Sequence, residues 1–314
     1  MMGILLKLIF SAVVLLFLAS PGIKAGANIS LNSNNASNVR ASVPSDANKI
    51  LETKSPKTNE ELLAPKRRQP AKNMPSAGNV ESAAVSPLKV MTYNIHHCKG
   101  MGGEISIERI ADVIRRSGAD IVGLQEVDRY FFRSNFQHQV KQIASKLGYN
   151  FAFGANLGIA PFGFGNAVVS RYPIISDRNI ALPGKLEPRG ALKATVRLKT
   201  GFDLAFITTH LGLSTSDREQ QVNAIIDSLK GMYKGVIIAG DFNARIESLE
   251  FSKLHEFFND SYQQVSPKNE GSTFGKHRID FIWLSPDLKA ISYSTMSSDA
   301  SDHLPVIVEV RPVN

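Results

Sequence analysis

Short apolar runs alternate with amphipathic stretches from residue 88 to the end of the chain. Runs of about four to eight apolar residues bounded by turn residues indicate buried strands. Runs that are apolar on both faces belong in the middle of a covered sheet. On this pattern we expect strands at residues 88–93, 121–124, 167–170, 204–208, 236–239, 281–284 and 304–310.

Three helices are predicted between these strands. Apolar residues recur at i, i+3, i+4 and i+7 from Ile107, Val140 and Val222, as they do on the buried face of a helix. Gly118 and Gly148 stand where the first two helices should end, since glycine accepts the left-handed conformation of a helix C-terminus. The alternation of strands and helices predicts an α/β domain over residues 87–314.

The amino-terminal part of the chain has a different character. Residues 1–27 carry Lys7, then an apolar run at 8–19, then Pro21 and small residues, which is the layout of a secretory signal peptide. An uncleaved membrane anchor over residues 4–19 is the alternative. Residues 28–86 lack aromatic side chains and apolar periodicity, so we expect a disordered linker. The protein is therefore expected to be exported, periplasmic or extracellular, with a membrane anchor as the alternative to cleavage.

Charge and cysteine content limit the possible functions. Of the formal net charge of +8, residues 1–86 carry +5 through ten Lys/Arg against five Asp/Glu, which leaves +3 on residues 87–314. That bias is weak, so charge alone does not indicate a nucleic-acid-binding protein. Cys98 is the single cysteine, which excludes an intramolecular disulfide and a zinc site built from cysteines.

Polar and ionisable residues flank the predicted strands in two groups. Four lie at carboxyl ends of strands: Asn94, Glu126, His210 and Asp241. Three lie at the amino ends of the last two strands: Asp280, Asp302 and His303. If those two strands run antiparallel to the others, both groups meet at one edge of the sheets, where open α/β folds place their sites.

Local spacing refines this expectation. Residues i and i+2 of a strand share a face, so Asp241 and Asn243 are expected to point together while Phe242 enters the core. Asp302 and His303 are neighbours and cannot both face a site from a regular strand. We expect this pair in a turn just before the last strand.

The residue types point to metal-assisted chemistry. Carboxylate and amide oxygens without cysteine suit Mg²⁺, with Mn²⁺ as the alternative, so Glu126 and Asn94 are candidate ligands. Asp241 can deprotonate a water that Asn243 positions. His303, paired with Asp280, can stabilise charge on phosphoryl oxygens or donate a proton.

Eight motifs carry a resemblance to a known family. In chain order they are MTYNIHH (91–97), LQEVD (124–128), GNAVVSRYPI (165–174), EPRGAL (187–192), TTHLG (208–212), GDFNA (240–244), RIDFIW (278–283) and SDHLPV (301–306). They resemble the endonuclease/exonuclease/phosphatase superfamily over about residues 88–312. The resemblance implies a four-layer α/β/β/α sandwich of two mixed sheets and a metal-assisted in-line attack of water on phosphorus.

The resemblance also implies roles for individual positions. Glu126 matches the family's principal metal ligand. Asn94 matches the residue of the first motif that lies next to that ligand, and Asp302 matches a carboxylate near the metal. The catalytic positions that match are His210, Asp241, Asn243, Asp280 and His303. Arg133, Asn166 and Arg189 look like the phosphate or substrate contacts of a compact bacterial branch. His96 and His97 fit a structural role equally well.

The sequence alone leaves the substrate open. A phosphodiester of nucleic acid is one expectation, and a phospholipid headgroup at a membrane surface is the other, since the short branch also resembles lipid-remodelling enzymes. The apolar stretch at residues 160–164 could enter a lipid surface. A non-catalytic binding protein on the same fold is the third possibility.

Overall fold

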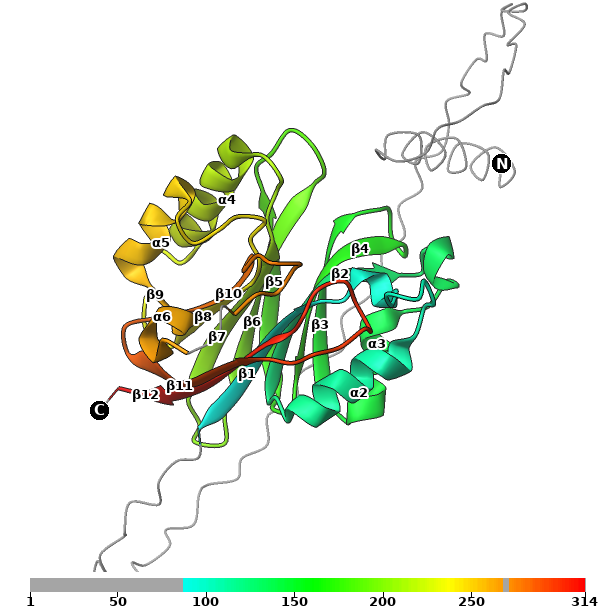
Figure 1. Cartoon of the computed structure of the whole chain (residues 1–314), viewed down its shortest axis with the longest axis horizontal. Coiled ribbons are helices and arrows are strands. Elements are labelled where there is room, and N and C mark those ends of the chain that lie inside the picture. Colours follow the sequence, from blue (N-terminus) through cyan, green and yellow to red (C-terminus); the bar gives the residue numbers. More distant parts are fainter. Residues whose placement is uncertain (1–86, 268–270, 314) are drawn as a thin grey trace, which may run out of the picture. The chain divides into compact units, whose positions relative to one another are not determined.

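Two six-stranded mixed sheets pack face to face (Figure 1). In this computed structural model residues 87–267 and 271–313 are described, so the predicted signal and linker lie outside the described residues. The first sheet has the order β11 (Leu288–Thr295), β12 (Val306–Pro312), β1 (Leu88–Asn94), β2 (Ile121–Arg129), β4 (Gly163–Ser170), β3 (Asn150–Leu157). The second has the order β5 (Ile174–Leu182), β6 (Arg189–Arg197), β7 (Asp203–His210), β8 (Val236–Asp241), β10 (Asp280–Leu284), β9 (Asn259–Asp260).

Helices cover the outer faces of both sheets, which gives the predicted four layers (Figure 1). α2 (Ile107–Ser117) and α3 (Gln139–Leu147) pack on the first sheet, and α4 (Thr215–Ser228) and α5 (Ser252–Phe257) on the second. The shorter helices are three 3-10 helices, η1 (His96–Cys98), η2 (Phe132–Ser134) and η3 (Leu249–Phe251), and the α-helix α6 (Ser261–Val265). Gly118 and Gly148 end α2 and α3 at φ 66° and 68°, as the sequence predicts.

The inner faces of the two sheets form one apolar core. It includes Phe206 from β7, Ile282 from β10 and Val308 from β12, all fully buried. The sheets approach closely at Gly123, where an added Cβ would lie 2.8 Å from Thr208 Oγ1 of the other sheet. A side chain at position 123 would therefore force the sheets apart next to the core.

A buried hydrogen-bond chain also joins the sheets. Gln125 Nε2 donates to Thr92 Oγ1 at 3.0 Å within the first sheet and to Thr208 Oγ1 at 2.8 Å in the second. Since Gln125 is fully buried, these bonds satisfy an amide that would otherwise be costly inside the core. They fix the sheets against each other one residue away from Glu126.

Strand directions match the expectation for the candidate site. β1 is parallel to β2, and β7 is parallel to β8. β12 runs antiparallel to β1 and β10 antiparallel to β8, so Asp280 stands directly opposite Asp241 in the register. Asp302 and His303 lie in a turn before β12, as predicted. Both groups of polar residues therefore reach one edge of the sandwich.

Some elements differ from the prediction. The last strand begins at Val306 rather than residue 304, because the Leu304 N–H donates to Thr273 O outside the sheet and Pro305 has no N–H to donate. The strands β3, β5, β6, β9 and β11 and the helices α5 and α6 were not predicted. β5 shows why, since most of its side chains are exposed or half-buried and form no apolar run. Within the described residues, no helix has the length and apolar character needed to cross a membrane.

The core between the sheets should dominate stability. We expect Phe206→Ala to lower the free energy of unfolding by about 3–5 kcal/mol, because the ring is fully buried and its loss leaves a cavity. Phe202→Ala, in the turn before β7 and 47% exposed, is the matched control and should cost clearly less. Urea unfolding checks both, and equal losses would contradict the assignment of this core.

Candidate active site

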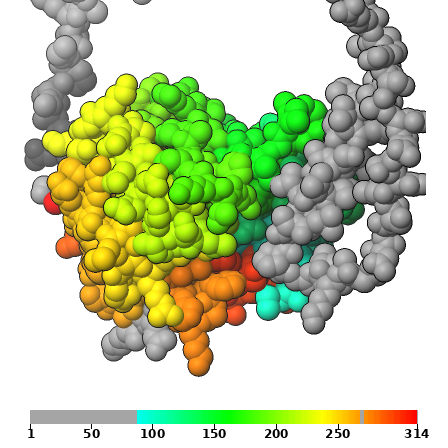
Figure 2. All heavy atoms as spheres, turned by 90° about the horizontal axis from the view of Figure 1, so that it is seen from above, coloured from blue at the N-terminus to red at the C-terminus, as the bar shows by residue number. Residues whose placement is uncertain are grey.

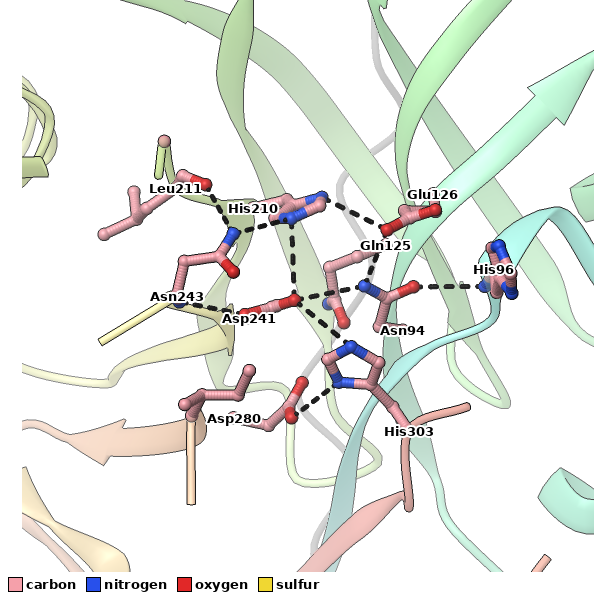
Figure 3. A network of polar contacts seen from close by, with 12 residues as sticks. Asn94, His96, Gln125, Glu126, His210, Leu211, Asp241, Asn243, Asp280 and His303 are labelled. Atoms are coloured by element: carbon pink, nitrogen blue, oxygen red, sulfur yellow. Dashed lines mark hydrogen bonds and ion pairs between the residues drawn. The ribbon is translucent and has the colours of Figure 1, made fainter. Parts of the chain in front are cut away.

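The polar residues converge where the carboxyl ends of β1, β2, β7 and β8 meet (Figure 3). Figure 2 looks onto this edge and shows the surface hollowed between the green β3–β4 hairpin and the yellow-green segments of the second sheet. The converging side chains and the hollow therefore lie at the same edge of the sandwich.

Asn94 joins the two sheets at this point. Its Nδ2 donates to Glu126 Oε1 at 3.0 Å and to Asp241 Oδ2 at 3.1 Å, and its Oδ1 accepts from the His96 N–H at 3.1 Å. The side chain is buried, and the main-chain carbonyl oxygen of Asn94 accepts from Ser301 Oγ at 2.8 Å. All parts of this amide are thus occupied, which fixes both carboxylates.

Glu126 lies inside β2 rather than at its end, which differs from the prediction. The pairing of β2 with β4 shifts between Leu124 and Val127, and Glu126 itself has φ 57°. Such a bulge re-aims a side chain that a regular strand would direct along the sheet face. A left-handed conformation is uncommon for glutamate, and residues held this way concentrate at functional sites.

Asp241 is almost fully buried at the end of β8. Its Oδ1 accepts from the Asn243 N–H at 2.9 Å, and His303 Nε2 lies 3.7 Å from its Oδ2. Burial and the neighbouring Asp280 charge raise the pKa of Asp241 to about 7, although His303 and the hydrogen bonds oppose this. A carboxylate with this pKa can accept a proton near neutral pH.

His303 and Asp280 form the predicted pair. His303 Nδ1 lies 2.9 Å from Asp280 Oδ2, and both side chains are buried. Burial disfavours the charged imidazole, but the charge and hydrogen bond of Asp280, with Asp241 and Asp302, raise the pKa of His303 to about 9. His303 is therefore a cation at neutral pH, with its second nitrogen facing Asp241.

His210 has the opposite electrostatic character. Asn243 Nδ2 donates to Leu211 O and also lies 2.9 Å from His210 Nε2, so this nitrogen acts as the acceptor. Burial, the charge of Arg189 and that of His303 hold the pKa of His210 well below its usual range. The imidazole is therefore neutral, with Nδ1 at 4.0 Å from Glu126 Oε1 and Nε2 at 3.5 Å from Asp241 Oδ2.

Asn243 reaches the site by a different route from the one predicted. Asp241 is the last residue of β8, and Asn243 has φ 50°, so the two do not share a strand face. A turn closed by the bond from the Asn243 N–H to Asp241 Oδ1 brings them together instead. Phe242 enters the core between them, as predicted.

Two clusters of titratable side chains have donor atoms within 4.8 Å of one another: His96, His97 and Glu126, and Asp241, Asp280 and His303. The second cluster already contains the His303–Asp280 pair. Glu126 in the first is half-buried, and Asp302 Oδ1 lies 3.6 Å from His96 Nδ1. A divalent cation therefore fits at Glu126, with Asp302 as a nearby oxygen donor. Asn94, predicted as a ligand, instead turns its Nδ2 towards Glu126, and its Oδ1 accepts from the His96 N–H, so it positions the carboxylate.

The three predicted substrate contacts lie in different surroundings. Arg189 Nε and Asn166 Oδ1 are buried and lack hydrogen-bond partners within the described part of the chain, so both keep capacity for a ligand. Asn166 Nδ2 donates to Gly190 O at 2.8 Å. Arg133 makes a two-point ion pair with buried Asp128 at 2.8 Å and stacks over Phe164. Its guanidinium is largely engaged in supporting the loop after β2.

Sequence reasoning missed several supporting residues. Ser301 Oγ binds Asn94 O, and Thr273 Oγ1 accepts from the Asp280 N–H at 3.2 Å. Ser301 stands beside Asp302 in the sequence, so the motif already contained it. Nothing in the local pattern marks Thr273, since its role depends on a loop that returns to the start of β10.

The fold and sequence match known proteins. The model of the endonuclease/exonuclease/phosphatase family matches residues 91–303. "Uncharacterized protein YbhP" of Escherichia coli strain K12 is 32% identical over 175 residues, which is 50% of this chain and 66% of that protein. The matched stretch thus spans just under two thirds of the relative.

Two solved structures have a similar fold. An endonuclease/exonuclease/phosphatase from Beutenbergia cavernae DSM 12333 has a TM-score of 0.62 at 25% identity, covering 72% of each chain. The human Nocturnin catalytic domain with bound sulfate anion has a TM-score of 0.59 at 24% identity, covering 73% of this chain and 94% of that one.

The His303–Asp280 pair should be visible in the pH dependence of stability. The pKa of His303 is raised in the folded state from its ordinary 6.5 to about 9, so its stabilisation is complete below pH 6.5 and lost as pH rises through about 9. We expect Asp280→Asn to lower this pKa and to flatten the loss of unfolding free energy between these values.

Imidazole NMR titration with urea unfolding at pH 6, 7.5 and 9 measures both effects. Asp177→Asn, on the exposed face of β5, is the control and should leave the His303 titration unchanged. An unaltered His303 midpoint in Asp280→Asn would show that another group holds its proton.

Proposed function

This chain belongs to the endonuclease/exonuclease/phosphatase family, and we propose that it is an exported, divalent-metal-dependent phosphodiesterase. The observation that carries the proposal is the single edge at which a cation-binding carboxylate, a buried base and a cationic histidine meet. Members of this family are phosphoesterases, and every position that the reaction needs is occupied here by a competent residue. Export rests on the signal-like residues 1–27.

The cation is assigned to Glu126, with Asn94 and Asp302 alongside. When bound, it supplies positive charge against a phosphoryl oxygen and orients the phosphate. Oxygen donors of this kind suit both Mg²⁺ and Mn²⁺. Asn94 Nδ2 holds the Glu126 carboxylate and so sets where the cation can lie.

Asp241 takes the proton of the attacking water. Its pKa of about 7 leaves a useful fraction ionised at neutral pH while keeping its basicity high. The Asn243 N–H and Asn94 Nδ2 fix the carboxylate through one oxygen each. Positioning of the base before the reaction removes much of the entropic cost of the attack.

The histidines and Arg189 act on the phosphate. His303 is held as a cation by Asp280 and stabilises charge that builds on the phosphoryl oxygens. Neutral His210 offers its Nδ1 proton as a hydrogen-bond donor. Arg189, with a buried guanidinium nitrogen that lacks a partner, and Asn166, with a free buried oxygen, complete the proposed substrate contacts.

The base is tested by an isosteric change. We expect Asp241→Asn to lower kcat/KM for bis-p-nitrophenyl phosphate by about 10²–10⁴-fold, since an amide cannot accept the proton. Assays use the full chain with Mg²⁺ or Mn²⁺, and EDTA should abolish turnover. Asp177→Asn, exposed on β5, is the matched control and should keep wild-type activity. If Asp241→Asn turns over as fast as wild type, Asp241 is not the base.

A specific surface feature favours a phospholipid headgroup as a second candidate substrate. Four large apolar side chains are about 70–80% exposed on separate loops: Met101 after β1, Ile159 between β3 and β4, Leu186 between β5 and β6, and Leu213 after β7. Strand directions place all four loops at the edge that carries the site. An apolar rim around a polar site suits entry into a lipid surface.

The rim predicts a selective defect. We expect Ile159→Ser with Leu186→Ser to lower hydrolysis of phosphatidylcholine–phosphatidylglycerol vesicles by at least about tenfold, because two apolar contacts with the lipid are lost. Activity on soluble bis-p-nitrophenyl phosphate should stay unchanged. Met232→Ser, 57% exposed before β8 at the opposite edge, is the control. Absence of vesicle hydrolysis together with cleavage of plasmid DNA would favour the nuclease.

A further inference from the structure

Three consecutive residues at the site edge hold a left-handed backbone. His96, His97 and Cys98 have φ values of 43°, 44° and 62°, and none of them is glycine. This conformation costs about 1–2 kcal/mol per residue for L-amino acids. A run of three is therefore a substantial local strain, and strain of this kind is retained where a site requires it.

The strained turn is held from several directions. The His96 N–H donates to Asn94 Oδ1 at 3.1 Å, and Gln139 Nε2 donates to His97 O at 2.5 Å. The Cys98 N–H donates to Ile95 O at 2.7 Å, and the Cys98 side chain is fully buried. α3, through Gln139, and β1, through Asn94, thus support the turn against relaxation.

The left-handed backbone places the imidazoles of His96 and His97 on the same side of the chain. Adjacent side chains of a strand point to opposite faces, yet these rings have centroids 4.5 Å apart at an interplanar angle of 75°. One donor atom from each ring lies within 4.8 Å of the other and of a Glu126 carboxylate oxygen. In Figure 3, His96 lies beside Asn94 and Glu126, on the side away from Asp241.

We propose that the cation at Glu126 takes imidazole ligands from His96 and His97, so that the site selects a transition-metal ion, Mn²⁺ or Zn²⁺, over Mg²⁺. Two imidazoles and a carboxylate with open positions are a donor set that such ions favour, whereas Mg²⁺ prefers oxygen ligands. The inference rests on the proposed function for its assignment of Glu126 as the metal carboxylate.

An ion pair does not account for the whole arrangement. His96 Nδ1 lies 3.6 Å from Asp302 Oδ1, which would explain one ring as the partner of a carboxylate. It leaves His97 unexplained, since the structure gives that ring no carboxylate within salt-bridge distance in the described residues, and its Nδ1 is buried without a hydrogen-bond partner. A shared cation accounts for both rings and for the strain that brings them together.

The test reads the metal directly. Electron spin echo envelope modulation of Mn²⁺ bound to the full chain should show ¹⁴N coupling from imidazole. The double variant His96→Ala with His97→Ala should lose this coupling and bind Mn²⁺ about 10–100-fold more weakly, while its Mg²⁺ affinity, measured by competition with Mn²⁺, changes little. His255→Ala, an exposed histidine on α5, is the matched control and should behave as wild type.

The outcomes separate this inference from the proposed function. Mn²⁺ bound without ¹⁴N coupling in the wild type, or equal losses of Mn²⁺ and Mg²⁺ affinity in the double variant, would overturn imidazole ligation and leave the metal-dependent enzyme in place. Failure of the wild type to bind either ion, or Glu126→Gln binding both as wild type does, would instead remove the metal site itself.

Discussion

The amide of Asn94 is the contact on which the site depends. It belongs to the first sheet, yet it donates to Glu126 of that sheet and to Asp241 of the second. The Glu126 and Asp241 carboxylates therefore keep a fixed separation only while the two sheets keep theirs. Gln125, bonded to Thr208 across the core, and Gly123, which admits the close approach, maintain that spacing one and three residues before Glu126 on β2. Core packing thus sets the active geometry.

Burial and neighbouring groups decide which side chains of the site are charged. Asp280 opposes Asp241 in the register of β10 and β8, so two carboxylates lie side by side in a dry environment. His303 forms an ion pair with Asp280, and the other nitrogen of its cationic ring faces Asp241. His210 contacts the amide of Asn243, and burial together with the charges of Arg189 and His303 keeps it neutral. One site thereby holds a cationic imidazole and a neutral imidazole.

The sequence predicted most elements that carry apolar runs, and it predicted one edge where polar residues meet on the condition that the last two strands run antiparallel to the others, which they do. It could not predict how each side chain reaches the site. Glu126 depends on a bulge, Asn243 on a tight turn, and His96 and His97 on a left-handed run, and all three are backbone conformations selected by tertiary contacts. β5 was not predicted because an exposed edge strand has no buried apolar face, and so its sequence shows no apolar run.

In the proposed reaction, water attacks phosphorus directly. The most direct measurement is the stereochemical course of hydrolysis of a phosphorothioate diester made chiral at phosphorus, carried out in ¹⁸O-labelled water. A single in-line displacement predicts inversion of configuration with one labelled oxygen on phosphorus. Retention would contradict the account, because it requires a covalent intermediate on the protein and a second displacement.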